Sequence, residues 1–224
     1  MQVGAVPMRT SVANAFVPFT VPLEWVVPWM YLDIKGLVTV GIGNLIDGMS
    51  GNDERDLVPA LVLPFVRSDG SPATSTEIAS AWRAVKSHKE LAKQGYKAAE
   101  KFTSIRLTDD GIRQVVLGKL AQNDKALSAR YTDWASWPAD AQLGVLSMAW
   151  AMGPAFKFPR FDAAVRSLDF IGAASECTIN ESGNPGVKPR NVRNRVLFRN
   201  AARVISERLD PDTLYWPTDL SAAA

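Results

Sequence analysis

The chain has 224 residues, of which 47% are hydrophobic, and its formal net charge is +2 at pH 7. This length and hydrophobic content suffice for one domain, or two closely joined lobes, with a sizeable core. The single cysteine, Cys177, excludes an internal disulfide, and the single histidine, His88, argues against a histidine-based metal site, a zinc cluster or a Ser-His-Asp triad. The sequence therefore predicts neither a metal nor another cofactor, and the small net charge does not by itself indicate a nucleic-acid partner.

The N-terminal segment predicts neither a secretion signal nor a membrane anchor. Residues 1–19 contain one cation, Arg9, and prolines interrupt their apolar runs. They lack the charged start and unbroken apolar stretch of a signal peptide, and the chain has no run of about 18 apolar residues. We expect no membrane span, synthesis in the cytoplasm, and an irregular N-terminal arm over residues 1–19. Its apolar anchors would be Val12, Phe16 and Phe19.

Residues 20–45 are predicted to form a short helix and then a β-hairpin. Thr20 can cap this helix with Pro22 in its first turn, where proline is tolerated, and Pro28 ends it. The four residues that begin at Asp33 read Asp-Ile-Lys-Gly, which is a tight-turn sequence, and β-forming residues flank it. Asp33 is therefore expected at the turn of the hairpin.

Three side chains of this region form a candidate catalytic set. A hairpin that turns at Asp33 would fold back beside Glu24, with the hydroxyl of Thr39 nearby. Two carboxylates that face each other across a cleft, with a hydroxyl between them, can support acid-assisted attack of water on a glycosidic bond. Apolar neighbours of Glu24, such as Trp25 and Trp29, would favour its protonated form near neutral pH.

The same stretch resembles the phage-type lysozymes, glycoside hydrolase family 24. That family carries a catalytic Glu, an Asp nine positions later and a Thr six positions further, followed by Gly-Ile-Gly. Glu24, Asp33 and Thr39 have this spacing, and a Gly-Ile-Gly run follows them. The resemblance implies that Glu24 protonates the leaving oxygen, Asp33 activates a water and Thr39 positions it, with inversion at the sugar. Asn44 stands where the family often has His, and we expect it to contact substrate.

The segment between residues 47 and 105 is predicted to begin with loops and to continue as a helix. Turn-forming residues dominate residues 47–75. A helix then begins at Ser75 or Thr76, and its apolar side contains Ile78, Ala81, Trp82 and Val85. Residues 50–105 exceed the corresponding part of the resembling family, so we interpret them as an insertion in the small lobe that lines one wall of the cleft.

The remainder of the chain has a helical pattern. Thr108 is the expected N-cap of one helix and Gly153 the expected C-cap of the next. Val165 and Leu168 are expected to point inward from a third helix. The predicted helices cover residues 108–131, 139–153, 161–174 and 189–209.

The last of these helices belongs to a basic stretch without an acidic residue. Its cations are Lys188, Arg190, Arg193, Arg195, Arg199 and Arg203. Such a stretch is either a solvated helix face or a surface that attracts an anionic polymer. Peptidoglycan with its carboxylates fits the second interpretation, and DNA competes without a nucleic-acid-binding motif to support it. In the resembling family an arginine of this region pairs with the catalytic Glu, so Arg190 and Arg193 are candidate substrate-site residues.

These patterns together predict an α+β, mainly α protein with a two-lobed, lysozyme-like fold. A small lobe with a β-hairpin and the insertion would cover residues 20–105, and a helical lobe would cover residues 106–224. Both lobes would form one catalytic domain over residues 20–224, behind the arm.

The expected function is that of a muramidase, which hydrolyses the β-1,4 bond between N-acetylmuramic acid and N-acetylglucosamine. The alternatives are a lytic transglycosylase, which uses a Glu but needs no Asp and Thr pair, and a non-catalytic protein that binds the cell wall. The expected partner is bacterial peptidoglycan, reached in the periplasm or in a target cell wall after release or delivery. We expect a monomer that acts as a phage endolysin or an antibacterial effector, with an immunity or inhibitor protein as a candidate second partner.

Overall fold

The computed structural model describes residues 8–47, 63–182 and 184–223. The chain divides into two compact units, one within residues 1–23 and 120–224 and the other within residues 24–119. We call them the helical unit and the sheet unit. The architecture is α+β and mainly helical, with one three-stranded and one two-stranded sheet, which confirms the expected fold class.

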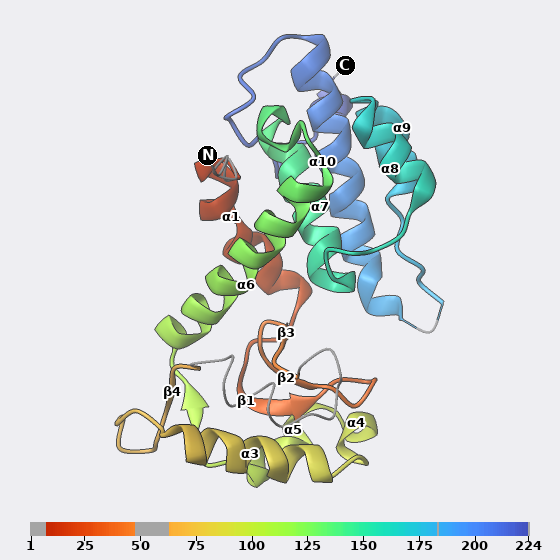
Figure 1. Ribbon diagram of the computed structural model, residues 1–224. Helices are drawn as coiled ribbons and strands as arrows, with labels where there is room; N and C mark the ends of the chain where they lie inside the picture. The colour runs from red at the N-terminus through yellow and green to blue at the C-terminus, as the bar shows by residue number, and fades with distance from the viewer. Residues whose placement is uncertain (1–7, 48–62, 183, 224) are drawn as a thin grey trace. The chain divides into compact units, whose positions relative to one another are not determined.

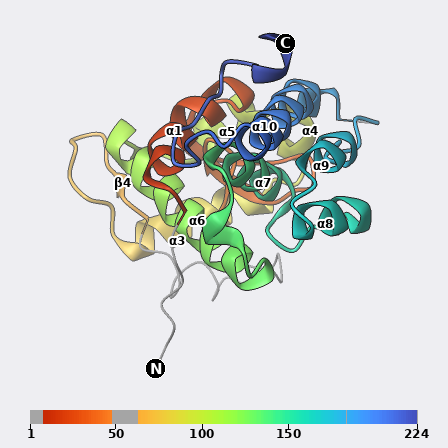
Figure 2. The same ribbon diagram turned by 90° about the horizontal axis from the view of Figure 1, so that it is seen from above.

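The helical unit is built around two long helices that lie side by side, α7 and α10 (Figures 1 and 2). Helix α9 packs against α10, α8 packs against α9, and α1 packs against α7. Helix α7 is buried along almost its whole length because apolar residues occupy all of its faces. The bounds are α1 Thr10–Thr20, α7 Ala139–Met152, α8 Pro159–Arg166, α9 Phe170–Glu176 and α10 Lys188–Ser206, with short 3-10 turns at Val21–Leu23, Trp134–Ser136, Pro185–Val187 and Leu220–Ala223.

The expected irregular N-terminal arm is wrong for residues 10–19, which belong to helix α1. Thr20 ends this helix and does not cap a following one, and Pro18 lies inside its last turn. The expected anchors are nevertheless fully buried, as Val12, Phe16 and Phe19 each have 0% exposure. Their spacing of four and three positions is that of one helix face. Burial of that face outweighs the local cost of the proline.

The helix expected over residues 161–174 is interrupted between α8 and α9. Leu168 has a φ of +59° and is 42% exposed, so the expectation that it points inward is wrong. The carboxylate of Asp169 accepts a hydrogen bond from the backbone N–H of Gly172 at 2.8 Å and thereby caps α9. Val165 is buried as expected. The capping aspartate therefore starts a new helix where the apolar spacing alone predicts continuation.

The expected ends of two other helices are confirmed. Helix α6, Asp109–Arg130, begins after Thr108, whose hydroxyl oxygen accepts the N–H of Gly111 at 3.0 Å. It runs along the chain from the sheet unit into the helical unit. Helix α7 ends at Gly153, which has a φ of +84°. In the described parts of the chain, no helix is both long and apolar enough to cross a membrane.

A buried carboxylate fastens the C-terminal tail to the helical unit. Asp140 on α7 has 0% exposure. It accepts hydrogen bonds from the Asn200 amide at 2.9 Å and from the backbone N–H groups of Tyr215 and Trp216 at 2.8 and 3.1 Å. Burial raises the pKa of the Asp140 carboxyl, although these donors oppose the rise. Asp140 is thus a structural residue of this unit.

The sheet unit contains a small antiparallel sheet of order β1-β2-β3, and helices α3, α4 and α5 contact its first strand (Figure 1). The expected start of α3 is confirmed, because Thr74 and Glu77 form a capping box there. Its expected apolar side is buried. The bounds are β1 Val27–Leu32, β2 Val38–Gly41, β3 Asn44–Leu45, β4 Phe65–Val66, α3 Ser75–Ser87, α4 Leu91–Gln94, α5 Tyr96–Ala99, a 3-10 turn Glu100–Phe102 and β5 Arg106–Leu107. Much of the loop expected over residues 47–75 lies outside the described residues.

The predicted hairpin is confirmed, with Asp33 at its turn between β1 and β2. The Oδ1 atom of Asp33 accepts the backbone N–H groups of Lys35 at 2.8 Å and Leu37 at 2.9 Å. Gly36 has a φ of +75°, a conformation that favours glycine. The Asp and Gly of this turn therefore fix its geometry by a side-chain bond and by backbone freedom.

Candidate functional site

Glu24 and Asp33 lie at the two ends of the segment that contains β1. Glu24 follows the 3-10 turn Val21–Leu23 directly, and β1 begins three residues after it, at Val27. Asp33 follows the last residue of the same strand. Both side chains are partly exposed. The short strand therefore sets the separation between the two candidate catalytic carboxylates.

Tyr31 on β1 interacts electrostatically with both of these carboxylates. Burial raises the pKa of the Tyr31 phenol, and the nearby negative charges of Glu24 and then Asp33 raise it further. Both carboxylates are thus close enough to the same phenol to disfavour its ionised form. Tyr31 is also the register partner of Thr39 on β2, so the two side chains are neighbours on one face of the sheet. Glu24 and Asp33 thus have Tyr31 as a common electrostatic neighbour, and Thr39 lies across the sheet from it.

The turn fixes Asp33 through one of its two carboxylate oxygens. Oδ1 accepts the hydrogen bonds from the backbone N–H groups of Lys35 and Leu37. Among the described residues Oδ2 accepts no hydrogen bond. A carboxylate held in this way keeps one orientation while its second oxygen remains an acceptor. That oxygen can take a proton from a bound water.

Thr39 is 5% exposed, and its hydroxyl donates to the Leu37 carbonyl oxygen at 3.2 Å. This bond orients the hydroxyl and leaves its lone pairs as acceptors. The geometry allows Thr39 to accept a hydrogen bond from a water that lies near Tyr31.

Asn44 points into the sheet unit and not toward solvent. It is 2% exposed, and its Nδ2 donates weakly to the Val115 carbonyl oxygen at 3.4 Å. Its Oδ1 has no partner among the described residues. A methyl group at Gly41, where φ is +67°, would come within 3.2 Å of this oxygen. This placement does not support the expected contact of Asn44 with substrate.

The two candidate arginines belong to the helical unit and are held by its core. Arg190 is 2% exposed, and its Nη1 donates to the carbonyl oxygen and the hydroxyl of Ser147 at 3.1 and 3.0 Å. Arg193 donates to the Phe19 carbonyl oxygen at 2.7 Å and lies over the rings of Phe19 and Trp216, 5.5 Å from each centroid. Glu24 belongs to the other unit, so its pairing with an arginine stays a prediction.

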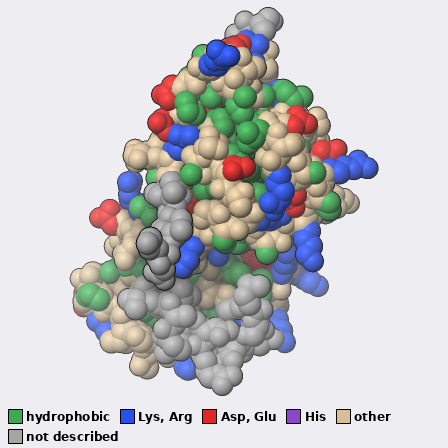
Figure 3. All heavy atoms as spheres, turned by 45° about the horizontal axis from the view of Figure 1, so that its top comes forward, with side chains coloured by type: hydrophobic (Ala, Val, Ile, Leu, Met, Phe, Trp, Pro, Cys, Tyr) green, Lys and Arg blue, Asp and Glu red, His purple; other side chains and the backbone are tan. Residues whose placement is uncertain are grey.

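The rest of the basic stretch carries less unpaired charge than its sequence indicates. Arg199 pairs with Asp219 at 2.7 Å, and Arg203 pairs with Glu207. Glu207 is four positions after Arg203, at the end of the same helix, whereas Asp219 lies in the C-terminal tail and reaches Arg199 only through the fold. Figure 3 shows acidic side chains interspersed among the basic ones on the face that it draws. The paired arginines are therefore weak candidates for attracting an anionic polymer.

An aromatic surface adjoins the acids within the sheet unit. It consists of Trp25, Trp29, Tyr31 and Tyr96. The Trp25 ring lies 5.7 Å from the Tyr96 ring at an interplanar angle of 33°, and Trp25 is 72% exposed. Trp25 is thus largely exposed, and the expected apolar cover of Glu24 stays a prediction. Sequence analysis also missed Tyr96, which α5 supplies from a distant part of the chain. The aromatic residues that follow Glu24 were the only sequence signal that an aromatic surface forms there, and they do not point to Tyr96.

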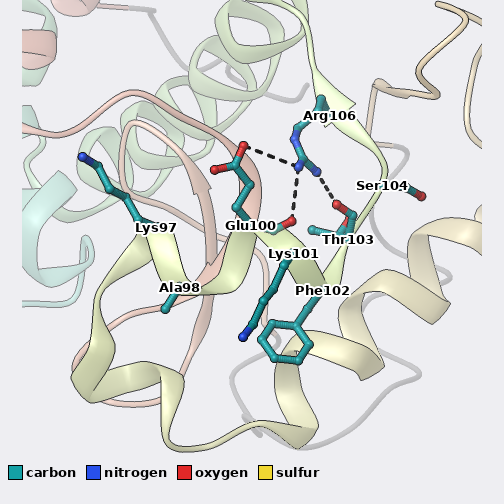
Figure 4. A pocket seen from close by; sticks show the side chains of 8 residues that line it. All are labelled: Lys97, Ala98, Glu100, Lys101, Phe102, Thr103, Ser104 and Arg106. Atoms are coloured by element: carbon teal, nitrogen blue, oxygen red, sulfur yellow. Dashed lines mark hydrogen bonds and ion pairs between the residues drawn. The ribbon is translucent and has the colours of Figure 1, made fainter.

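A hollow of about 780 Å³, whose lining side chains are drawn in Figure 4, is linked to this aromatic surface through Arg106. Arg106 lies at its edge, with its guanidinium 5.2 Å from the centroid of the Trp29 ring. The guanidinium also bonds to the backbone carbonyls of Thr103 and Glu100. The hollow is lined by Lys97, Ala98, Glu100, Lys101, Phe102, Thr103, Ser104 and Arg106. Neither candidate catalytic carboxylate contributes to it, so the hollow is not the site of the proposed chemistry.

The other reactive side chains take structural positions. His88 stacks on Phe102 with ring centroids 4.1 Å apart and pairs with Glu90. Cys177 is fully buried, and burial raises the pKa of its thiol to about 11. Within the described residues, no group of three or more His, Cys, Asp or Glu side chains could hold a metal ion.

Comparison with family models, with curated proteins and with solved structures found no match to this chain.

Proposed function

We propose that this chain is a peptidoglycan hydrolase of the muramidase type. It would cleave the β-1,4 bond between N-acetylmuramic acid and N-acetylglucosamine. The supporting observation is that Glu24 and Asp33 flank strand β1 and that both charges act on Tyr31 of that strand, whose cross-strand neighbour is Thr39. These residues also have the sequence spacing of the phage-type lysozymes. We propose the lysozyme-like fold on the same basis, with the sheet unit as the small lobe and the helical unit as the large lobe.

The proposed reaction divides the proton transfers between the two carboxylates. Glu24 donates its proton to the glycosidic oxygen as the bond to the anomeric carbon breaks. Asp33 accepts a proton from the attacking water through its second oxygen, and its charge stabilises the positive charge that develops on the sugar. Thr39 orients that water. Glu24 then carries the negative charge and Asp33 the proton, and the cycle closes when Asp33 releases its proton to solvent and Glu24 regains one from it.

The Tyr31 phenol adds no third negative charge near the two carboxylates. Its raised pKa keeps the phenol protonated well beyond neutral pH. A protonated phenol retains its O–H donor and its oxygen acceptor for hydrogen bonds to a water or a sugar hydroxyl. Tyr31 is therefore a positioning residue in this proposal.

The identity of the product tests the proposal. Purified peptidoglycan would be digested with the wild-type protein and with Glu24→Gln, and the released fragments would be identified by mass spectrometry. Hydrolysis by the wild type leaves muramic acid at a reducing end, and the variant should release almost none. A 1,6-anhydro end would instead identify a lytic transglycosylase. Binding to the glycan without any released fragment would identify a non-catalytic wall-binding protein.

We extend the proposal to the setting in which the enzyme works. Peptidoglycan lies in the periplasm or in a target cell wall, so a muramidase must be released or delivered there. A phage endolysin and an antibacterial effector both fit this chemistry.

A further inference from the structure

The most exposed aromatic side chain of the sheet unit lies next to a candidate catalytic acid. Trp25 follows Glu24 in the chain and is 72% exposed, and the adjoining Val26 is 48% exposed. Moving a large apolar side chain out of water lowers the free energy of the protein, so the exposure of Trp25 needs a reason. Exposed tryptophans are common where one apolar face meets a ligand and the ring edge stays in contact with water.

The Tyr96 ring lies against the Trp25 ring. The Tyr96 ring packs against the rings of Trp29 and Tyr31, each at a centroid distance of 6.3 Å. The indole N–H of Trp29 donates to the Tyr96 carbonyl oxygen at 2.9 Å. Gly95 reaches a φ of +80° just before it, which lets α5 begin at Tyr96. Strand β1 and helix α5 therefore support a prearranged platform, and binding to it costs little ordering entropy.

The platform is continuous with the candidate catalytic residues. The ring of Tyr31 packs against Tyr96, and the charges of Glu24 and Asp33 act on its phenol. A ligand that stacks on Trp25 would thus extend toward the two carboxylates. All of these residues belong to the sheet unit.

We propose that the platform of Trp25 and Tyr96 binds an N-acetylhexosamine unit of the glycan strand by stacking against its apolar face. A β-1,4-linked hexosamine carries its polar groups at the ring edge, so its C–H faces match an exposed indole. A nucleic-acid base could also stack on the exposed ring, so a single-stranded oligonucleotide is the competing ligand in the test. The choice of this sugar rests on the proposed muramidase function.

A binding measurement tests the platform without turnover. The Glu24→Gln protein would be titrated with the N-acetylglucosamine hexamer by calorimetry, and with a single-stranded oligonucleotide as the competing ligand. Adding Trp25→Ala should weaken hexamer binding about tenfold or more, the usual value of one aromatic stack. Trp25→Phe keeps an aromatic face and should stay within about threefold of the parent. Ile171→Ala is the control, because Ile171 is also exposed, at 57%, but lies in the helical unit.

A kinetic measurement separates substrate binding from chemistry. In the protein with Glu24 intact, Trp25→Ala should raise KM about tenfold and leave kcat within about threefold, because stacking also contributes to ground-state binding. Tyr96→Ala should change KM in the same direction by removing the support of Trp25. Circular dichroism would show that both variants keep the wild-type fold.

The outcomes distinguish the platform from the muramidase. Hexamer binding that is unchanged by Trp25→Ala overturns the platform, and so does stronger binding of the oligonucleotide than of the hexamer. Wild-type release of glycan fragments with reducing-end muramic acid would support the muramidase in either case. Conversely, hexamer binding that depends on Trp25, without any fragment release, supports the platform and removes the proposed hydrolysis.

Discussion

The two units use the same residue types for different purposes. In the helical unit Trp134, Trp137, Phe161 and Phe198 are all at most 1% exposed, and the Trp134 indole N–H is bonded to Asp124 at 2.8 Å. In the sheet unit Trp25 is 72% exposed. Aromatic residues of the first kind fill a core, and those of the second kind cannot be explained by packing. The contrast directs attention to the sheet unit as the place of function.

The carboxylates show the same contrast. Asp140 in the helical unit is fully buried, and both of its oxygens accept hydrogen bonds from protein donors. Asp33 in the sheet unit is partly exposed and uses one oxygen for its turn. A saturated carboxylate stabilises the fold, whereas a carboxylate with a spare acceptor can take part in proton transfer. Substitutions of Asp140 and Asp33 should therefore have opposite effects on stability and turnover.

The largest effect on turnover is expected for Glu24→Gln. The amide cannot donate the proton that the leaving oxygen needs, so the rate of peptidoglycan cleavage should fall about 10²–10⁴-fold. The thermal unfolding midpoint should stay close to that of the wild type. Clearing of a peptidoglycan suspension by the folded variant at the wild-type rate would remove Glu24 from the role of acid.

Asp33→Asn should have the next largest effect, about 10²-fold in kcat. An asparagine side-chain oxygen can still accept the N–H groups of Lys35 and Leu37, so the hairpin should keep its fold. The variant thus removes the charge and leaves the turn. A kcat equal to that of the wild type, in a variant with an unchanged unfolding midpoint, would show that Asp33 has only a structural role.

Thr39→Ala should slow turnover about tenfold, which is the value of one lost hydrogen bond to an oriented water. Thr39→Ser keeps the hydroxyl and should recover most of the rate. The comparison is made on kcat at saturating peptidoglycan. If Thr39→Ala proves more damaging than Asp33→Asn, the assignment of the water-activating group to Asp33 is wrong.

Asp140→Asn should have the smallest effect on turnover and a clear effect on stability. The new amide nitrogen leaves a backbone donor at Tyr215 or Trp216 without its acceptor, which costs about 1–3 kcal/mol of unfolding free energy. Chemical denaturation measures this loss, and kcat below the unfolding transition should equal that of the wild type. A large loss of kcat in the folded variant would break the contrast between the two units.

The pH dependence of Asp140 sharpens the same test. Because burial raises its pKa in the folded protein, its contribution to stability is fully present below its unfolded pKa of about 3.9. The contribution is lost as the pH rises through the folded pKa. The stability difference between the wild type and Asp140→Asn should therefore be larger at about pH 4 than at pH 7. An increase of this difference with rising pH would contradict the raised pKa.

Local signals in the sequence predict the hairpin and several helix ends correctly. Asp33 and Gly36 define their turn through bonds and conformations within a few residues. Thr108 and Gly153 likewise act on their nearest helical turn. Such signals need no knowledge of the rest of the fold, which is why they could be interpreted in advance.

The features that sequence analysis missed depend on contacts between distant segments. Tyr96 meets Trp25 only because α5 packs on β1. Arg199 finds its acidic partner in the C-terminal tail. Asn44 turns inward because helix α6 offers it a carbonyl acceptor. Tertiary contacts decide these positions, and a pattern of neighbouring residues does not contain them.

Cleavage of peptidoglycan in oxygen-18 water tests the central claim most directly. Three proteins would be compared by mass spectrometry of their products: the wild type, Glu24→Gln in the sheet unit and Asp140→Asn in the helical unit. Our account predicts oxygen-18 at the new reducing-end muramic acid with the wild type and with Asp140→Asn, and almost none with Glu24→Gln. Unlabelled 1,6-anhydro products from the wild type, or equal labelling by the wild type and Glu24→Gln, would contradict it.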